Sequence, residues 1–160
     1  MNQIAEEITF VRENICGHLP SLQTVEPYER YPGRPVSAFY DPVPRSFGIL
    51  ENYTGKQMHM LVKDHKAKGL CSTDHKNHIM RHEVAHAMVD YIIRTTPDWK
   101  TRIDKIKEKM ATIPKEEYGQ TLSVLAFETP YECISESYCC YMDGNNNLFA
   151  QDILRTLFGG

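Results

Sequence analysis

Apolar residues recur at the three- or four-residue spacing of an amphipathic α-helix in five stretches of the chain. The pattern predicts helices over residues 2–15, 74–94, 97–110, 130–142 and 148–158. Proline in the first turn, as at Pro97 and Pro130, is typical of a helix start. Asp143 and Gly144 are typical of a helix end. The sequence therefore indicates where the C-terminal helices begin and end as well as which faces they bury.

The stretch from Pro20 to Phe47 has a different composition, with six of the nine prolines of the chain and several aromatic residues. Proline lacks a backbone N–H and pushes the preceding residue towards extended geometry, so a helix is excluded here. Aromatic residues argue against disorder. We expect an ordered covering loop that includes a short strand at about residues 36–40.

The next segment alternates between apolar and polar residues, which is the period of a half-buried strand. Phe47–Leu50 and Gln57–Lys63, joined through a turn at Gly55, predict a β-hairpin. One more short strand is expected at residues 69–71. The helix that follows could be capped by any of three short polar residues, which are Ser72, Thr73 and Asp74.

Together these elements predict one α+β domain over residues 1–160. A short twisted sheet from the N-terminal half is expected to pack against the helix over residues 74–94, followed by a mainly helical C-terminal half. A chain of 160 residues can bury a core of ordinary size without disulfides or other cross-links.

Charge and cysteine content narrow the possible partners and compartments. A net charge of −3 gives no field that would attract nucleic acid or an anionic membrane, so neither is an expected partner. No apolar run is long enough to span a bilayer, and acidic residues interrupt the N-terminus where a signal peptide is apolar. Five cysteines, two of them adjacent, make a poor disulfide framework. We expect a cytoplasmic protein, or one exported without a cleaved signal, as effectors and toxins can be.

The strongest chemical signal is the run His82-Glu83-Val84-Ala85-His86, an H-E-x-x-H pattern within a predicted helix. Residues four apart lie on one helix face, so His82 and His86 could bind one metal ion. Glu83 lies about 100° round the helix axis, where its carboxylate could reach a water on the metal rather than the metal itself. This arrangement predicts a zinc site with Glu83 as general base.

A catalytic zinc ion needs a third protein ligand and one open position. Glu132 and Glu136, four residues apart on the predicted helix over residues 130–142, place two carboxylates on one face. Two neighbouring carboxylates repel unless each has a positive or hydrogen-bonding partner. Glu132 as zinc ligand and Glu136 as acceptor from the distal nitrogen of a ligand histidine would satisfy both.

Two alternatives exist for the ligand set. His78 lies on the same helix face as His82 and His86, but only the latter pair has a carboxylate at the position of the base, so we expect His78 to face solvent or substrate. A closed structural zinc site would need a fourth protein ligand, for which Cys71 and Cys133 are candidates.

The stretch from about Asn77 to Met142 resembles the gluzincin metallopeptidases. It is most similar to the catalytic domains of the lethal factor type and to the bacterial Pro-Pro endopeptidases. The resemblance implies a zincin-like fold, His82, His86 and Glu132 as zinc ligands, and Glu136 in support. The family also places an oxyanion-binding tyrosine shortly before the third ligand. The matching position here is Leu125, and Tyr118 is the tyrosine whose surroundings are similar to the motif.

We therefore expect a zinc-dependent endopeptidase that cleaves a peptide or protein substrate bound in extended form along an edge strand. In the expected mechanism, Glu83 takes a proton from water and passes it to the leaving nitrogen, and Tyr118 or another residue stabilises the oxyanion. The alternatives are an inactive or structural zinc module, a peptide-binding protein that does not cut, and a zinc hydrolase acting on another acyl substrate.

Overall fold

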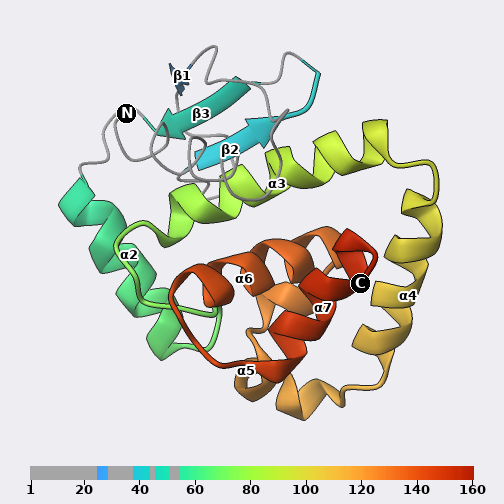
Figure 1. The fold of residues 1–160 in the computed structure, drawn as a ribbon. Helices are drawn as coiled ribbons and strands as arrows, with labels where there is room; N and C mark the ends of the chain where they lie inside the picture. Colours follow the sequence, from blue (N-terminus) through green and yellow to red (C-terminus); the bar gives the residue numbers. More distant parts are fainter. Residues whose placement is uncertain (1–24, 29–37, 44–45, 51–54) are drawn as a thin grey trace.

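The computed structural model describes residues 25–28, 38–43, 46–50 and 55–160. This part of the chain is mostly helical, with a short sheet beside the central helix (Figure 1). The strands are β1 (Val25–Tyr28), β2 (Ala38–Asp41) and β3 (Ser46–Leu50). The α-helices are α2 (Gly55–Ala67), α3 (His78–Thr95), α4 (Trp99–Ala111), α5 (Tyr118–Thr121), α6 (Pro130–Met142) and α7 (Leu148–Phe158). The predicted helix over residues 2–15 lies outside the described residues.

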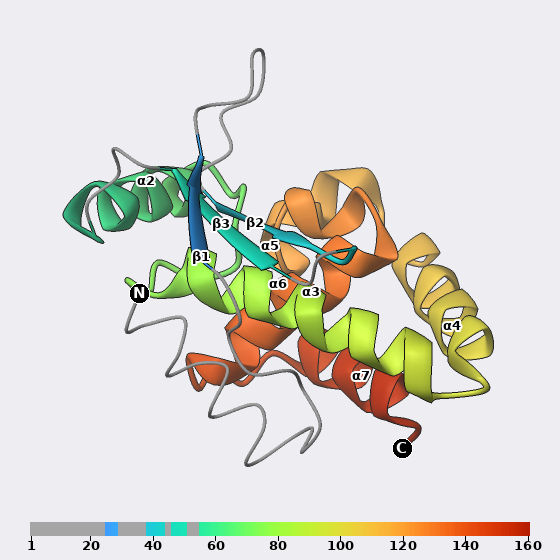
Figure 2. The same cartoon turned by 90° about the horizontal axis from the view of Figure 1, so that it is seen from above.

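The strands form one three-stranded sheet in the order β1-β3-β2. β1 runs parallel to β3, and β2 runs antiparallel to it, with Phe39 opposite Gly48. The structure confirms strands close to residues 36–40 and 47–50, whereas β1 was not predicted. Within the described residues, β2 is an edge strand, and it is the strand next to α3 (Figure 2).

The predicted hairpin is wrong in its second half, because residues 57–63 belong to helix α2. Met58, Met60 and Val62 alternate as in a strand, but only two of them are buried. Met58 and Val62, four residues apart, face the core, while Met60 is 62% exposed. The alternation at residues 58–62 therefore comes from one turn of a helix, in which Met58 and Val62 face the core and the exposed Met60 lies between them in the sequence.

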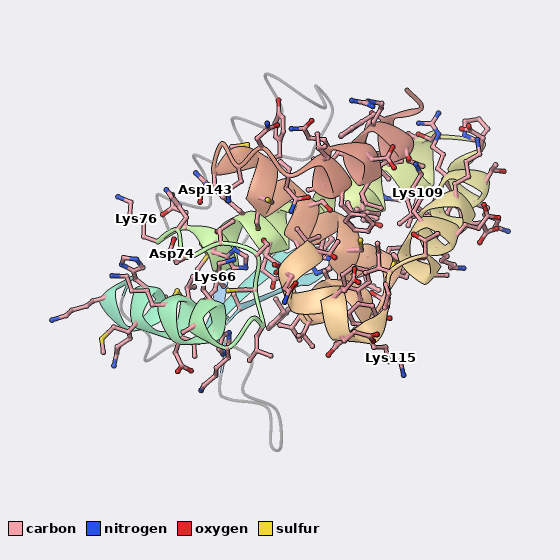
Figure 3. The ribbon with its side chains drawn as sticks, turned by 90° about the horizontal axis from the view of Figure 1, so that it is seen from below. Lys66, Asp74, Lys76, Lys109, Lys115 and Asp143 are labelled. Carbon is pink, nitrogen blue, oxygen red and sulfur yellow. The ribbon has the colours of Figure 1, made fainter. Side chains whose placement is uncertain are left out.

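The segment over residues 68–77 contains turns and bends, so the strand expected at residues 69–71 is absent from it. Lys66 Nζ at the end of α2 donates to the Ser72 carbonyl at 2.8 Å and ties this segment to α2 (Figure 3). The predicted capping by Ser72, Thr73 or Asp74 is also wrong. Asn77 occupies the cap position of α3 and makes no side-chain cap bond, while Thr73 contacts the ring of His78.

The C-terminal helices agree closely with the predicted boundaries. α6 covers residues 130–142 and α7 covers residues 148–158. The Thr129 hydroxyl accepts from the Glu132 amide at 3.1 Å, and Pro130 occupies the first turn, so both start signals act together. Gly159 ends α7 in the left-handed conformation, with φ of 82°, as expected of a terminal glycine. The linking region over residues 114–129 contains α5 and two 3-10 turns, at Lys115–Glu117 and Leu125–Phe127.

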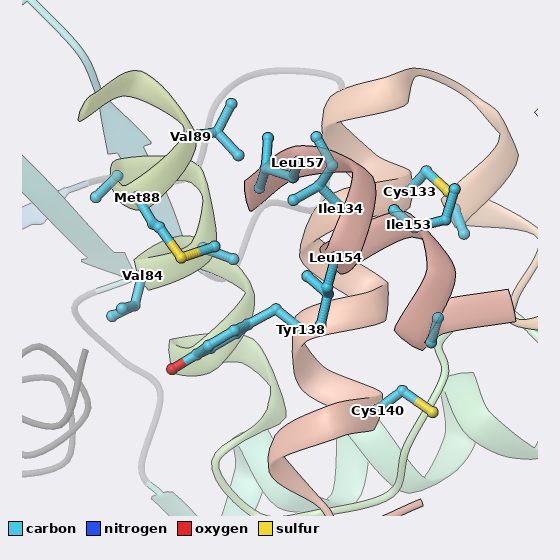
Figure 4. Packing of buried hydrophobic residues seen from close by; sticks show 14 of the residues in the cluster. Val84, Met88, Val89, Cys133, Ile134, Tyr138, Cys140, Ile153, Leu154 and Leu157 are labelled. Carbon is cyan, nitrogen blue, oxygen red and sulfur yellow. The ribbon is translucent and has the colours of Figure 1, made fainter. Parts of the chain in front are cut away.

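The core lies where α6 packs between α3 and α7, on the side of α3 away from the sheet (Figures 1 and 2). Figure 4 shows the contact: Val84 and Met88 of α3 approach the ring of Tyr138 of α6, and Leu154 of α7 lies near the other end of that side chain. All four side chains are at least nine-tenths buried. α3 is therefore fixed on both sides, by the sheet and by the helix pair. Among the described helices, none combines the length and apolar character needed to cross a membrane.

Candidate metal centre

The side chains of His82, His86 and Glu132 meet between α3 and α6. Glu132 Oε2 lies 2.9 Å from His82 Nε2, and Glu132 Oε1 lies 3.4 Å from His86 Nε2. The two histidines share a face of α3 because they are four residues apart. Glu132 approaches from the first turn of α6, where the Thr129 cap and Pro130 fix the start of the helix. The structure thus brings together the three residues that the sequence predicted as ligands.

These three side chains lie at the wall of a cavity of about 530 Å³. They are partly accessible, with exposed fractions of 13% for His82, 22% for His86 and 29% for Glu132. Most of the remaining wall is apolar or aromatic and comes from β2, from the second half of α3 and from the start of α6. It includes Phe39, Tyr40, Pro42, Val89, Ile93 and Tyr131. A small molecule or a peptide side chain can therefore reach the cluster.

Glu136 lies behind the cluster and is almost completely buried. Its Oε1 is 2.9 Å from His82 Nδ1, the nitrogen that faces away from Glu132. A carboxylate only accepts, so Nδ1 keeps a proton towards Glu136, and Nε2 can offer its lone pair to a metal that replaces the proton it shares with Glu132. This is the contact that the sequence predicted for Glu136. His86 has a distal partner of its own, because the Ser135 hydroxyl lies 3.3 Å from its Nδ1.

His78 occupies a different position from the one predicted. It is buried, and its Nε2 lies 3.1 Å from Glu136 Oε1, so it faces neither solvent nor the open cavity. Thr73 Oγ1 lies 3.1 Å from the other ring nitrogen. Ser72 adds two bonds: its amide donates to Glu136 Oε2, and its hydroxyl donates to the Glu136 carbonyl. The segment over residues 68–77 therefore holds Glu136 from the side opposite His82.

Glu83 points into the same cavity as His82 and His86. Its carboxylate accepts a backbone hydrogen bond from Tyr40 in β2. The Tyr40 hydroxyl donates to Asp90 Oδ2 at 3.0 Å, so β2 contacts two residues of α3 that are seven apart. This double attachment fixes the edge strand along the helix and sets the position of the Glu83 carboxylate.

Burial and neighbouring charges shift the pKa values of the groups in this cluster in opposite directions. Burial acts to raise the pKa of Glu132 and Glu136, but their imidazole partners outweigh it and hold both pKa values well below the usual range. Burial acts to lower the pKa of His82, but contacts with Cys139, Glu132 and Glu136 raise it well above the usual value. Burial raises the pKa of Glu83. These shifts favour the ion pairs of Glu132 and Glu136 with His82, and a cation bound at His82 would have to displace the proton of the nitrogen that it uses.

The donor set fits zinc. Four ligands placed tetrahedrally at zinc–ligand distances near 2.0 Å lie roughly 3.3 Å from one another, and the two distances to Glu132 are 2.9 and 3.4 Å. Imidazole and carboxylate are common zinc donors, and three such ligands leave one position open. The three donor atoms all lie within 4.8 Å of each other.

Other residues considered from the sequence lie elsewhere. Tyr118 starts α5 and stacks on Phe127 with ring centroids 4.0 Å apart, and it does not line the cavity. Tyr40 and Tyr131 line the cavity instead. Neither Cys71 nor Cys133 belongs to a candidate metal-binding group in the described part of the chain, which removes both as fourth ligands. Cys71 is buried with its thiol directed at the carbonyls of Val62 and Thr73.

Comparisons with protein-family profiles, curated proteins and solved structures gave no match. The case for the site accordingly rests on its geometry. Sequence reasoning missed Ser72, Ser135 and Cys139, whose contacts depend on how α3, α6 and the segment over residues 68–77 pack. Ser135 and Cys139 left a visible signal, because they lie three and seven residues after Glu132 and so on the same helix face.

Proposed function

We propose that this protein is a zinc-dependent endopeptidase in which His82, His86 and Glu132 hold the metal and Glu83 is the general base. The observation that carries the proposal is the meeting of these four side chains at one accessible cavity. Their sequence positions are 46 to 50 residues apart across the two helices, so local structure alone does not bring them together. The placement of α3 between a short sheet and a second ligand-bearing helix supports a zincin-like fold.

The residues have distinct tasks in this proposal. A zinc ion held by His82, His86 and Glu132 would supply Lewis-acid chemistry, polarising a carbonyl and lowering the pKa of water. Glu83 would accept the proton of the attacking water and pass it to the leaving nitrogen. The Tyr40 amide orients the Glu83 carboxylate for that exchange. Glu136 keeps the proton of His82 on Nδ1, away from the metal side.

The substrate we propose is an extended peptide segment of a protein. Phe39, Tyr40 and Pro42 place the edge strand β2 and the turn after it at the cavity wall, and an edge strand can pair with a peptide backbone. Apolar groups of Val89, Ile93 and Tyr131 also line the cavity and suit an apolar substrate side chain. The nearby charge of Asp90 is neutralised by Arg94, whose Nη2 lies 2.9 Å from its carboxylate.

Cleavage of a peptide library by zinc-loaded protein, read by mass spectrometry, tests the proposal. We expect defined cleavage sites, loss of cleavage on chelation and recovery on adding zinc. Glu83→Gln is the matched control, because it preserves the shape and the ligands but removes the base. Zinc-loaded wild-type protein that cleaves no peptide would refute the proposal. Hydrolysis of small esters or amides by that same protein would favour a different zinc hydrolase, and unproductive peptide binding would favour a recognition module.

A further inference from the structure

The two helices that form the candidate metal centre face each other along a longer row of metal-binding side chains. α3 contributes His78, His82 and His86 at intervals of four residues, and α6 contributes Glu132, Glu136 and Cys139 at intervals of four and three. Both sets follow one face of their helix. The proposed catalytic site uses only the end of this row that contains His86 and Glu132.

The other end holds a second group of donor atoms. One ligand atom each from His78, His82 and Cys139 lies within 4.8 Å of the others. Glu136 lies beside this group of three, with its Oε1 3.1 Å from His78 Nε2 and 2.9 Å from His82 Nδ1. The three donor atoms thus have a carboxylate next to them, which contacts both imidazoles.

This second group differs from the first in its access to solvent. Cys139 is fully buried, and Glu136 and His78 are 1% and 4% exposed. None of the three lines the open cavity. Four protein ligands without a solvent-facing position are typical of a closed metal site rather than a catalytic one.

The chemistry of the four donors selects a class of cation. A thiolate, two imidazoles and a carboxylate suit zinc and its thiophilic relatives cadmium and cobalt, whereas magnesium and calcium prefer oxygen ligands alone. A divalent cation bound by one thiolate, one carboxylate and two neutral imidazoles leaves no net charge. Neutrality matters here because an uncompensated charge at a buried position is very costly.

We propose that His78, His82, Glu136 and Cys139 form a second, closed binding site for a thiophilic divalent cation. We call it the inner site, and we call the group of His82, His86 and Glu132 the outer site. The proposal for the inner site depends only on the donors of that site, whether or not the outer site cleaves peptides.

The two sites share His82, and this sharing makes them antagonistic. His82 contacts Glu132 through Nε2 and Glu136 through Nδ1, so its two nitrogens face opposite sites. A neutral imidazole keeps a proton on one nitrogen and can offer a lone pair only from the other. If cations filled both sites at once, both nitrogens of His82 would have to bind a metal, and the imidazole would have to give up its remaining proton. A cation in either site therefore weakens binding at the other.

Absorption of cadmium or cobalt complexes tests the inner site, because a sulfur-to-metal charge-transfer band reports a thiolate ligand directly. The protein is prepared metal-free, reduced and without oxygen, and is then titrated with the cation. His86→Ala removes an outer ligand and leaves all four inner donors. We expect this variant to develop the band with one equivalent of cation. Zinc bound to the wild-type outer site should shift the cadmium titration to higher concentrations.

Further substitutions in the His86→Ala protein identify the ligands. Cys139→Ser should abolish the band. Cys140→Ser is the matched control, because Cys140 is an adjacent buried cysteine that points away from α3 and should keep the band (Figure 4). His78→Ala should lower cation affinity by at least the roughly tenfold that even an outer-shell partner is worth.

Far-UV circular dichroism establishes that each variant is folded, and Cys139→Ala replaces the serine variant if that one is not. A folded His86→Ala protein without the band at saturating cadmium overturns the inference. A band that survives loss of the Cys139 thiol, or that disappears with Cys140→Ser, also overturns it. These outcomes are separate from the fate of the proposed peptidase activity, because His86→Ala is expected to lack that activity in any case.

Discussion

Replacing Glu136 by Gln tests the link between α6 and the ligand His82. The carboxylate accepts from His82 and His78 through Oε1 and from the Ser72 amide through Oε2. Glutamine offers one oxygen and one NH₂ group in the same space. If its oxygen faces the imidazoles, its NH₂ meets the Ser72 N–H, and in the opposite orientation it meets the imidazole donors. Either orientation sets donor against donor at a buried position.

The expected magnitude follows from these contacts. Loss of an outer-shell partner lowers metal affinity by about 10- to 100-fold, which corresponds to roughly 1.4–2.7 kcal/mol. An unsatisfied buried donor costs a further 1–3 kcal/mol or so of folding stability, which lowers the melting temperature by roughly 2–12 °C for a chain of this size. Glu136→Gln should therefore weaken zinc binding and reduce stability together.

Competition with a chromophoric chelator measures the zinc affinity, and thermal unfolding by circular dichroism measures the stability. Both are made in a Cys139→Ser background, so that only the outer site contributes. The control is Glu128→Gln, an exposed glutamate just before α6 whose replacement makes the same change in charge. Zinc affinity within twofold of the parent for Glu136→Gln would show that Glu136 does not orient His82.

Three more outcomes are expected. Glu83→Gln should keep stoichiometric zinc and lower the peptidase rate by at least about 100-fold, and near-full activity of the loaded variant would contradict the proposed base. Burial raises the pKa of the Cys71 and Cys133 thiols to about 12, so at pH 8 only about one molecule in 10⁴ carries either group as a thiolate. Peptide mapping after brief alkylation should therefore find both cysteines unmodified until the protein is unfolded. Ile134→Ala in the fully buried centre of α6 should cost about 2–5 kcal/mol of unfolding free energy in a denaturant titration, whereas a loss under 1 kcal/mol would mean that the contact of α6 with α3 and α7 is loose.

The sequence predicted the helices α3, α4, α6 and α7 because each carries a helical stripe of apolar residues, and for α6 the start and stop signals agreed with that stripe. It failed at α2, where the decisive feature was which of three alternating side chains is buried. Periodicity over seven residues cannot distinguish a stripe at Met58 and Val62 from a strand that also buries Met60. Tertiary packing made that choice.

The candidate site was predictable to the extent that its residues share a helix face. The spacing of His82 to His86 and of Glu132 to Glu136 placed each pair correctly, and the structure shows the two pairs facing each other. The positions of His78 and Ser72 were not predictable, because they depend on how an irregular segment folds back onto α6. For Tyr118, a short motif pointed to the site, but stacking on Phe127 keeps its ring outside the cavity.

The capped start of α6 has a consequence for how this protein can vary in length. Thr129 and Pro130 fix the residue at which α6 begins. The starting residue decides which face of the helix carries Glu132, Glu136 and Cys139. Inserting one residue between Thr129 and Glu132 would turn all three by about 100° away from α3. The same insertion between Lys115 and Thr121 lies before the start of α6 and leaves these three residues on the same face of the helix. Additions and deletions are thus far better tolerated before the cap than after it, and a series of one-residue insertions would map the boundary.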